Sequence, residues 1–535
     1  MNERSKHDSF NLSGSVFLIT SDGRTLNLPI PSESPCDPLN WSSKKRALAL
    51  LSIGLYSYVG LVVTQGASLT AKGLAQEFPY EQTKPFTIES LITAPTLFMG
   101  IGAFLWVPLS CALGRRPVFV IAAVLMLLAS LAAGVSKSYY QLLACVSVLG
   151  LTEGFSLSCA LLMIIDLTFI HQRPSAIAMV WSVVGSFNLA SLSSVPFITD
   201  HGMEWRRFFL YWSIPAGINC LTAFIFFPET YFKRPIVAFD GLTILQSATE
   251  KLTIYEDDAL QDSDVSVYNK DLPSVPDRTP LRAFFAHFCL CRSTFASWKS
   301  MLLCYPQIAF CFFNPLIFWV VLNTAANFAG MMFIGATYAM VLGSPPYSLP
   351  SKLIINVNNT ASVGSLIAWP LSGPLVCYIL KRLSRRNKGV REAEHYLIGY
   401  ILPVLAGALS TLIYGFAVHY KWHFAAFCLS YGLNAFSFSS ISIANTLWVT
   451  EAFPRWAAPA LVVVGGGSYI ASFVMSIALV PWIAKQGYLL VGAELTVLQV
   501  VLGMVAVPAA FWGKGVRQRI HARWAERREG ALRPL

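Results

Sequence analysis

Twelve apolar stretches, each about as long as a membrane-spanning helix, lie six and six around a polar middle. A helix needs roughly 20 apolar residues to cross a hydrocarbon core of about 30 Å. Polar backbone groups cannot be left bare in lipid, so such stretches must be helical. The expected spans are 47–66, 90–110, 117–136, 140–164, 176–198, 207–227, 304–328, 353–376, 396–417, 423–447, 458–482 and 489–512.

The spans predict an all-α membrane protein of twelve transmembrane helices in two six-helix, pseudo-symmetric halves. Only 13% of the 535 residues are charged, whereas about 25% of the residues of a typical soluble domain are charged. Two halves of six spans are the plan of a transporter that rocks one half against the other. The expected parts are a cytosolic arm (1–46), a first half (47–228), a cytosolic central loop (229–303), a second half (304–512) and a basic cytosolic tail (513–535).

The positive charge of the chain is unevenly distributed. Of its 39 Lys and Arg residues, 31 lie in the termini and in the loops predicted on the same side of the membrane. This asymmetry is the positive-inside pattern and places both termini in the cytosol. The net charge of +11 therefore indicates contact with an anionic lipid surface rather than with nucleic acid. We expect a monomer embedded in the bilayer.

Glu153 lies near the middle of the fourth predicted span. An ionisable group in the membrane is costly and is a functional candidate by default. Burial favours the protonated form of a carboxyl group, which suits a proton carrier. The alternative is a neutral Glu153 that hydrogen-bonds Thr152 or Ser156 and serves packing alone.

Amide and aromatic side chains occur where a central cavity would lie. A largely apolar pocket with a few amides and one carboxyl fits an organic molecule better than a sugar or an ion. Each amide alone can equally hold two helices together. Asn314-Pro315 should also break the seventh span beside such a cavity. The candidate cavity residues are Trp181, Phe187, Asn188, Asn314, Trp319, Asn323, Tyr431 and Asn434.

Motifs of enzymes and of metal sites are not found in the sequence. There is no Gly-x4-Gly-Lys-Ser/Thr nucleotide loop and no His-Glu-x-x-His metal motif. Cys289-Leu-Cys291 has no second pair at ligand spacing. We therefore expect neither an enzyme nor a metal site, and no cofactor beyond a proton gradient.

Several loop motifs together resemble one known family. Gly114-Arg115-Arg116-Pro117 follows the second span, Asp166 to Arg173 follows the fourth, and Arg386 to His395 lies between the eighth and ninth. Pro228-Glu229-Thr230 closes the sixth span. In these positions the motifs resemble the major facilitator superfamily, and within it the fungal drug:proton antiporters with twelve spans.

In that fold, Arg115 and Arg116 are near enough to pair with Asp166. By the same repeat logic, Arg385 and Arg386 are predicted to pair with Glu451. Such pairs would hold one access state and break in the other. The alternative is that these arginines only reflect the positive-inside rule.

The chain departs from the family pattern at three places. Cys111 and Cys377 stand where an Asp is common, which reduces the gating charge in both halves. The fifth span lacks the central Gly-Pro of the antiporters, although Gly185, Ala190 and several serines keep it small. The missing Gly-Pro weakens an assignment of export from that motif.

The resemblance and the residues together predict a proton-coupled secondary transporter. Its expected role is export of a hydrophobic small organic molecule, such as a drug, toxin or secondary metabolite, across the plasma membrane. The alternative is a proton-coupled importer of an organic cation, a polyamine or a nutrient on the same fold. A cation importer should offer several acids inside the membrane, and only Glu153 is evident.

Overall fold

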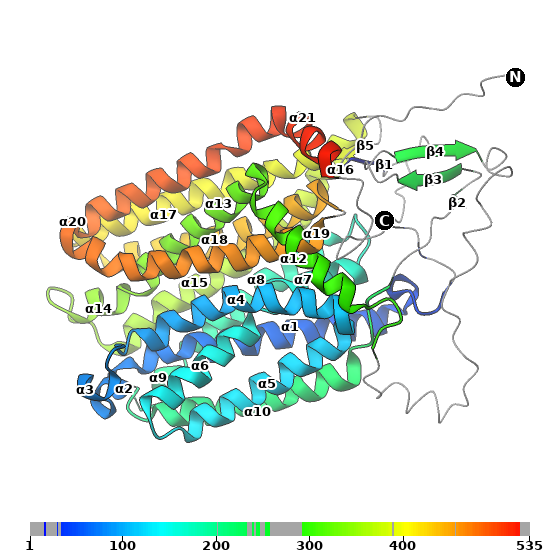
Figure 1. Ribbon diagram of the computed structural model, residues 1–535. Helices are drawn as coiled ribbons and strands as arrows, with labels where there is room; N and C mark the ends of the chain where they lie inside the picture. The colour runs from blue at the N-terminus through cyan, green and yellow to red at the C-terminus, as the bar shows by residue number, and fades with distance from the viewer. Residues whose placement is uncertain are drawn as a thin grey trace, which may run out of the picture.

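The computed structural model describes residues 15–17, 29, 31, 34–200, 202–232, 238–239, 242–246, 252–256, 292–387, 390–454 and 456–524. These residues form a bundle of long helices in two lobes (Figure 1). The first lobe contains α1 (Ser43–Gln65), η2 (Gly66–Thr70), α2 (Ala71–Glu77), α3 (Tyr80–Thr83), α4 (Ser90–Leu113), α5 (Arg115–Val135), α6 (Tyr139–Glu153), α7 (Cys159–Leu167), α8 (Arg173–Leu192), α9 (Val195–Ile198) and α10 (Trp205–Phe226).

The second lobe follows the central loop. Its elements are α12 (Trp298–Phe312), α13 (Pro315–Gly335), α14 (Tyr338–Gly343), α15 (Ser351–Ser372), α16 (Pro374–Arg386), η5 (Ala393–Tyr400), α17 (Ile401–His419), α18 (Phe424–Ala452), α19 (Ala457–Val462), the π-helical η6 (Val463–Gly467), α20 (Ser468–Met504) and α21 (Ala506–Trp524).

Short strands and one 3-10 turn lie outside the bundle. The turn η1 (Pro38–Asn40) precedes α1. Strand β1 (Ser15–Phe17) pairs antiparallel with β5 (Val390–Glu392). Strands β2 (Ala238–Phe239), β3 (Leu242–Gln246) and β4 (Leu252–Glu256) form a second antiparallel sheet within the predicted central loop. Most of the remaining central loop, including Cys289 and Cys291, lies outside the described residues.

Ten helical stretches within the described residues are long and apolar enough to cross a membrane. Helices α6 and α7, with 15 and 9 residues, are too short to qualify singly. The last stretch, Ala457–Arg517, has 61 residues and would measure about 90 Å as one straight helix. It reverses at Gly487, whose φ is 79°, so the two arms of α20 run in opposite directions (Figure 1).

The helix breaks only partly follow the sequence analysis. The predicted break at Asn314-Pro315 is present between α12 and α13, where Asn314 Oδ1 accepts a hydrogen bond from the Leu316 N–H at 3.0 Å. The fourth predicted span, expected to be continuous, is interrupted between Glu153 and Cys159. The eighth continues past its predicted end as α16, after a break at Gly373.

The lobes meet most extensively where α8 packs against α15 and α18, and where α4 packs against α12, η6 and α20. Hydroxyl groups join α8 to α15. The hydroxyl oxygens of Ser186 and Ser362 lie 2.9 Å apart, and the Ser365 hydroxyl donates to the Ser182 carbonyl at 3.2 Å. Glycine allows α4 to approach η6 closely, because a Cβ on Gly100 would lie 2.8 Å from the backbone oxygen of Gly466. Small residues and hydroxyls are the usual means of close helix approach in lipid.

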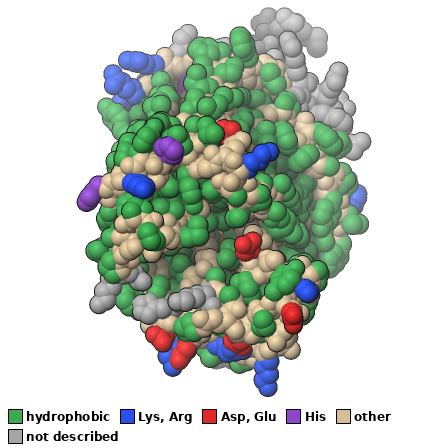
Figure 2. Space-filling model, turned by 90° about the vertical axis from the view of Figure 1, so that its left-hand side faces the viewer, with side chains coloured by type: hydrophobic (Ala, Val, Ile, Leu, Met, Phe, Trp, Pro, Cys, Tyr) green, Lys and Arg blue, Asp and Glu red, His purple; other side chains and the backbone are tan. Residues whose placement is uncertain are grey.

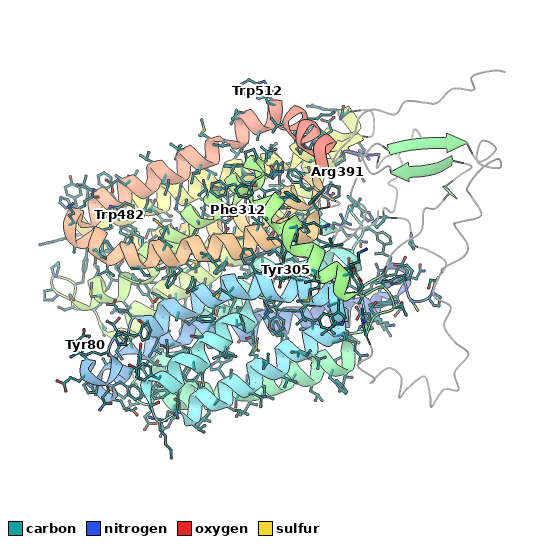
Figure 3. All side chains as sticks on the ribbon, viewed as in Figure 1. Tyr80, Tyr305, Phe312, Arg391, Trp482 and Trp512 are labelled. Atoms are coloured by element: carbon teal, nitrogen blue, oxygen red, sulfur yellow. The ribbon has the colours of Figure 1, made fainter. Side chains whose placement is uncertain are left out.

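Helix α1 begins and α21 ends at the same end of the bundle (Figure 1), here called the terminal end. The opposite end, called the distal end, carries the turn in α20. Figure 2 looks onto the distal end and shows a hollow in the molecular face. Figure 3 places Tyr80 and Trp482 at the distal end and Arg391 at the terminal end.

Candidate substrate pocket

A pocket with about 740 Å³ of space not filled by atoms lies between the lobes. Helices α1, α6, α7 and α8 line it from the first lobe, and α13, α15, α18 and α20 from the second. The lining residues are Ser57, Leu61, Gln65, Glu153, Ser156, Leu157, Leu161, Val180, Trp181, Val184, Gly185, Asn188, Leu189, Phe328, Met331, Ser365, Ala435, Phe438, Ser439 and Tyr469.

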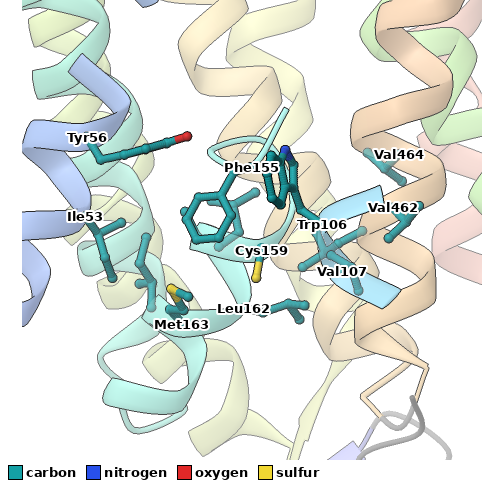
Figure 4. Packing of buried hydrophobic residues seen from close by; sticks show 14 of the residues in the cluster. Ile53, Tyr56, Trp106, Val107, Phe155, Cys159, Leu162, Met163, Val462 and Val464 are labelled. Atoms are coloured by element: carbon teal, nitrogen blue, oxygen red, sulfur yellow. The ribbon is translucent and has the colours of Figure 1, made fainter. Parts of the chain in front are cut away.

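The break between α6 and α7 brings backbone and carboxyl groups to the pocket wall. A helix end leaves its last carbonyls without helical partners. Two side chains take over this role: Trp106 Nε1 donates to the Leu151 carbonyl at 2.7 Å, and the Tyr56 hydroxyl donates to the Thr152 carbonyl at 2.6 Å. Phe155, in the break itself, packs near the rings of Tyr56 and Trp106 (Figure 4). The interruption is therefore a built feature that is satisfied inside the first lobe.

Glu153 is the last residue of α6 and is completely buried. The Ser156 hydroxyl donates to its Oε2 at 3.2 Å, whereas Oε1 has no hydrogen-bond partner within the described part of the chain. Gly60 on α1 faces the carboxyl group so closely that a Cβ would collide with Oε2. The glycine thus makes the space that the carboxyl occupies. A buried carboxyl with one free oxygen can take up a proton or accept a hydrogen bond from a ligand.

Three more polar groups of the first lobe face the pocket. Asn188 Nδ2 donates to Gln65 Oε1 at 2.8 Å, which ties α8 to α1. Asn188 Oδ1 and Trp181 Nε1 are buried and have no partner among the residues that the structure describes. This wall therefore offers a ligand one amide acceptor and one indole donor.

The wall from the second lobe is mostly apolar. Phe328, Phe438 and Tyr469 supply aromatic surface, and Phe328 lies 5.3 Å from Tyr469 between ring centroids. The hydroxyls of Ser365 and Ser439 are 2.8 Å apart and bond to each other. No Lys, Arg or His is among the described residues that line the pocket. An anionic ligand would find no counter-charge there.

Of the eight residues predicted for the cavity, Trp181 and Asn188 line the pocket and the other six lie elsewhere. Asn323 and Asn434 are buried inside the second lobe, where Asn434 Nδ2 donates to Ser410 at 3.0 Å. Trp319 Nε1 donates to the Leu502 carbonyl at 2.7 Å. Tyr431 packs 5.5 Å from Tyr338 between ring centroids.

The last two of these six residues lie at the ends or on the outside of their helices. Asn314 caps the start of α13. Phe187 is 60% exposed, and its ring centroid lies 6.2 Å from that of Tyr58. Neither side chain is among the residues that line the pocket.

Ion pairs cluster at the terminal end. Arg115, the first residue of α5, pairs with Asp166 on α7, as its predicted position suggested. Arg116 donates to the Phe224 carbonyl at 3.1 Å. The predicted partners of Glu451 need correction, because its Oε1 bonds Arg173 Nη1 at 2.8 Å.

The correction has a geometric reason. Arg385 and Arg386 are exposed in the last turn of α16, whereas Glu451 is buried near the end of α18. Arg173 opens α8, so its pair with Glu451 joins the first lobe to the second. The internal-repeat argument placed the contact within one lobe and therefore missed the cross-lobe partner.

Glu229 belongs to the Pro228-Glu229-Thr230 motif, but the sequence analysis does not predict it as a site residue. Its carboxylate accepts the backbone N–H groups of Arg115 and Arg116 at 2.9 and 3.3 Å. Burial raises the pKa of Glu229, and these N–H groups oppose the rise. The carboxylate thus caps the start of α5. The position of Glu229 directly after the sixth predicted span is the feature of the sequence that could have indicated this role.

A two-lobed bundle of membrane-length helices around one shared pocket defines a multi-pass membrane protein of the transporter type. The family model of the Major Facilitator Superfamily matches residues 47–476. The chain therefore belongs to the major facilitator superfamily, whose members are transporters and not enzymes.

Relatives of similar length support this assignment. An uncharacterized MFS-type transporter of Schizosaccharomyces pombe is 22% identical over 531 residues, covering 94% of this chain and 89% of that protein. Efflux pump radE of Floropilus chiversii is 24% identical, covering 92% of this chain and 84% of that protein. The solved structure of the proton:xylose symporter XylE bound to 6-bromo-6-deoxy-D-glucose has a TM-score of 0.58 at 14% identity, covering 90% of this chain and 100% of that one. It shares the fold.

Proposed function

We propose that this chain is a proton-coupled secondary transporter that exports a hydrophobic small organic molecule by alternating access. The observation that carries the proposal is Glu153, a buried carboxyl with a free oxygen at a helix break that faces the pocket between the lobes. Discontinuous helices near the bilayer midplane are a common way to build substrate and ion sites in transporters. Proton uptake and substrate binding would compete at this group.

The proposed topology has twelve membrane crossings. The α6–α7 pair and the two arms of α20 add two crossings to the ten helical stretches, which gives twelve. The positive-inside pattern then places the terminal end, with both chain ends, in the cytosol. The ion pair of Arg173 with Glu451 joins the lobes at the terminal end and the distal face is hollowed, as expected for a state open to the outside. We further propose that the protein works as a monomer in the plasma membrane.

The composition of the pocket narrows the substrate. Aromatic and aliphatic side chains dominate it, and its polar groups are one carboxyl, two amides, an indole and several hydroxyls. This pattern favours a neutral or singly cationic organic molecule over an organic anion. Export is supported by the similarity to radE, which is named an efflux pump, and by the resemblance of the loop motifs to the fungal drug:proton antiporters.

The test is accumulation of a compound panel in yeast that lack their own drug exporters. Cells that make the protein should accumulate less of at least one apolar compound than cells that do not. An uncoupler that removes the proton gradient should abolish the difference. Higher accumulation would indicate import instead, and equal accumulation of every compound, with the protein present in the plasma membrane, would contradict the proposal.

A further inference from the structure

A buried carboxylate joins the two lobes at the terminal end. Glu451 on α18 is 6% exposed and bonds Arg173 of the other lobe at 2.8 Å. Separation of the lobes at this end would carry Arg173 away on α8. A buried carboxylate left without a partner is strongly unfavourable. A second cation close to Glu451 would therefore change the free energy of opening.

Arg391 of the second lobe is a buried cation that forms no ion pair with a carboxylate among the residues that the structure describes. It is 7% exposed, and its Nε and Nη2 have no hydrogen-bond partner within the described ranges. Its guanidinium lies 4.6 Å from the ring centroid of Tyr396. Its backbone is held in β5, paired with Val16 of β1, at the terminal end (Figure 3). The side chain is thus fixed in place while most of its hydrogen-bonding capacity is unused.

Arg391 lies near the ion pair of Arg173 with Glu451, as shown by the charged groups that surround Tyr396. The Tyr396 hydroxyl lies within electrostatic range of Arg391, Glu451 and Arg173. On the first lobe, the pKa of His171 is lowered by burial and then by Arg391 and Lys381. Arg391 therefore lies near Tyr396, which is also close to the Arg173–Glu451 pair, and within electrostatic range of His171 on the opposite lobe.

We propose that Arg391 is a positioning residue that takes over Glu451 from Arg173 when the lobes separate at the terminal end. This inference rests on the alternating access proposed above. In the closed state Glu451 bonds the first lobe, and in the open state it bonds Arg391 within its own lobe. The carboxylate is paired in both states, so the two states stay close in free energy and a substrate or proton can shift them.

The exchange is tested by the distance between the lobes in the full chain, reconstituted in lipid nanodiscs. Spin labels on S43C and R386C, with the exposed Cys36 replaced by Ser, report that distance by electron double resonance. R391Q should lower the ratio of open to closed protein by about tenfold or more, because a charge-assisted hydrogen bond is lost only in the open state. R173Q should raise the ratio by a similar factor. Opposite shifts from two neighbouring arginines are not expected of residues that only stabilise the fold.

A double-mutant cycle identifies the partner. In an E451Q background, R391Q should cause no further shift, since its partner is already gone. A shift that persists would overturn the proposal and indicate another anionic partner for Arg391. R385Q, the same charge change at an exposed position of α16, is the matched control and should leave the ratio unchanged.

R391K keeps the charge and is the variant to use if R391Q does not reach the membrane. It should shift the ratio in the same direction as R391Q but less, since it lacks the guanidinium fork. No shift, or a shift towards the open state, would contradict the exchange. Uphill transport is measured separately in yeast, so a failed exchange leaves the proposed function standing. A chain that never transports would instead remove the function.

Discussion

Three polar side chains of the first lobe and one buried amide of the second lobe lie in different surroundings. In the first lobe Glu153, Asn188 and Trp181 face the pocket, and each has a hydrogen-bonding atom without a partner among the described residues. In the second lobe Asn445 Nδ2 donates to Thr324 at 2.7 Å, and Oδ1 of the same amide accepts from Tyr400 at 2.5 Å. The first lobe thus offers unused hydrogen bonds to a ligand, whereas this amide of the second lobe uses its own to join helices.

The difference separates recognition from cohesion in a fold with two similar halves. A polar group that faces a pocket contributes to affinity and coupling, and its loss should leave the fold intact. A polar group satisfied between helices contributes to stability, because its removal leaves buried partners unpaired. Three substitutions test this division, from the largest expected effect on transport to the smallest.

Replacement of Glu153 by Gln should abolish uphill, gradient-driven transport. Glutamine keeps the size and the contact with Ser156 but cannot exchange a proton. Exchange of substrate down its gradient should continue, which separates coupling from binding. The measurement is accumulation against a gradient in proteoliposomes with an imposed pH difference.

Glu494 provides the matched control for that experiment. It accepts a hydrogen bond from Trp482 at 2.8 Å near the turn of α20, away from the pocket. E494Q should transport uphill like the unmodified protein. Uphill transport by E153Q would show that the carboxyl does not carry the proton.

Replacement of Asn188 by Ala should raise KM by about 2- to 10-fold, the range expected for one lost hydrogen bond. The bond to Gln65 is lost as well, but both side chains lie at the pocket surface. The melting temperature of the purified protein should therefore change little. An unchanged KM together with a lower melting temperature would assign Asn188 to cohesion and erase the contrast between the lobes.

Replacement of Asn445 by Ala should act in the opposite way. Tyr400 and Thr324 would each lose a buried hydrogen-bond partner, at a cost of about 1–3 kcal/mol for each unpaired group. Thermal unfolding in detergent should begin at a clearly lower temperature, while KM in the folded protein should stay within about twofold. A large change in KM would place the amide network of the second lobe in the substrate path.

Much of the architecture was predictable, because membrane-length apolar segments leave the backbone few choices. The break at Asn314-Pro315 followed from proline chemistry, and the ion pair of Arg115 with Asp166 followed from loop motifs. The break after Glu153 was missed, since Gly154, Ser156 and Ser158 are tolerated within membrane helices. The hydroxyl of Tyr56 and the indole of Trp106, both distant in the sequence, bond two of the carbonyls that the break leaves without helical partners.

The sequence by itself determined a helical membrane protein in two lobes, the side that carries the positive charge, and a carboxyl in the fourth span. Only the tertiary structure decided which amides reach the pocket and that Glu451 bonds Arg173 across the lobes. The physical reason is that lipid and protein interior are both apolar. Hydrophobic periodicity therefore marks where a helix crosses the membrane but not which of its faces meets lipid, a neighbouring helix or the shared pocket.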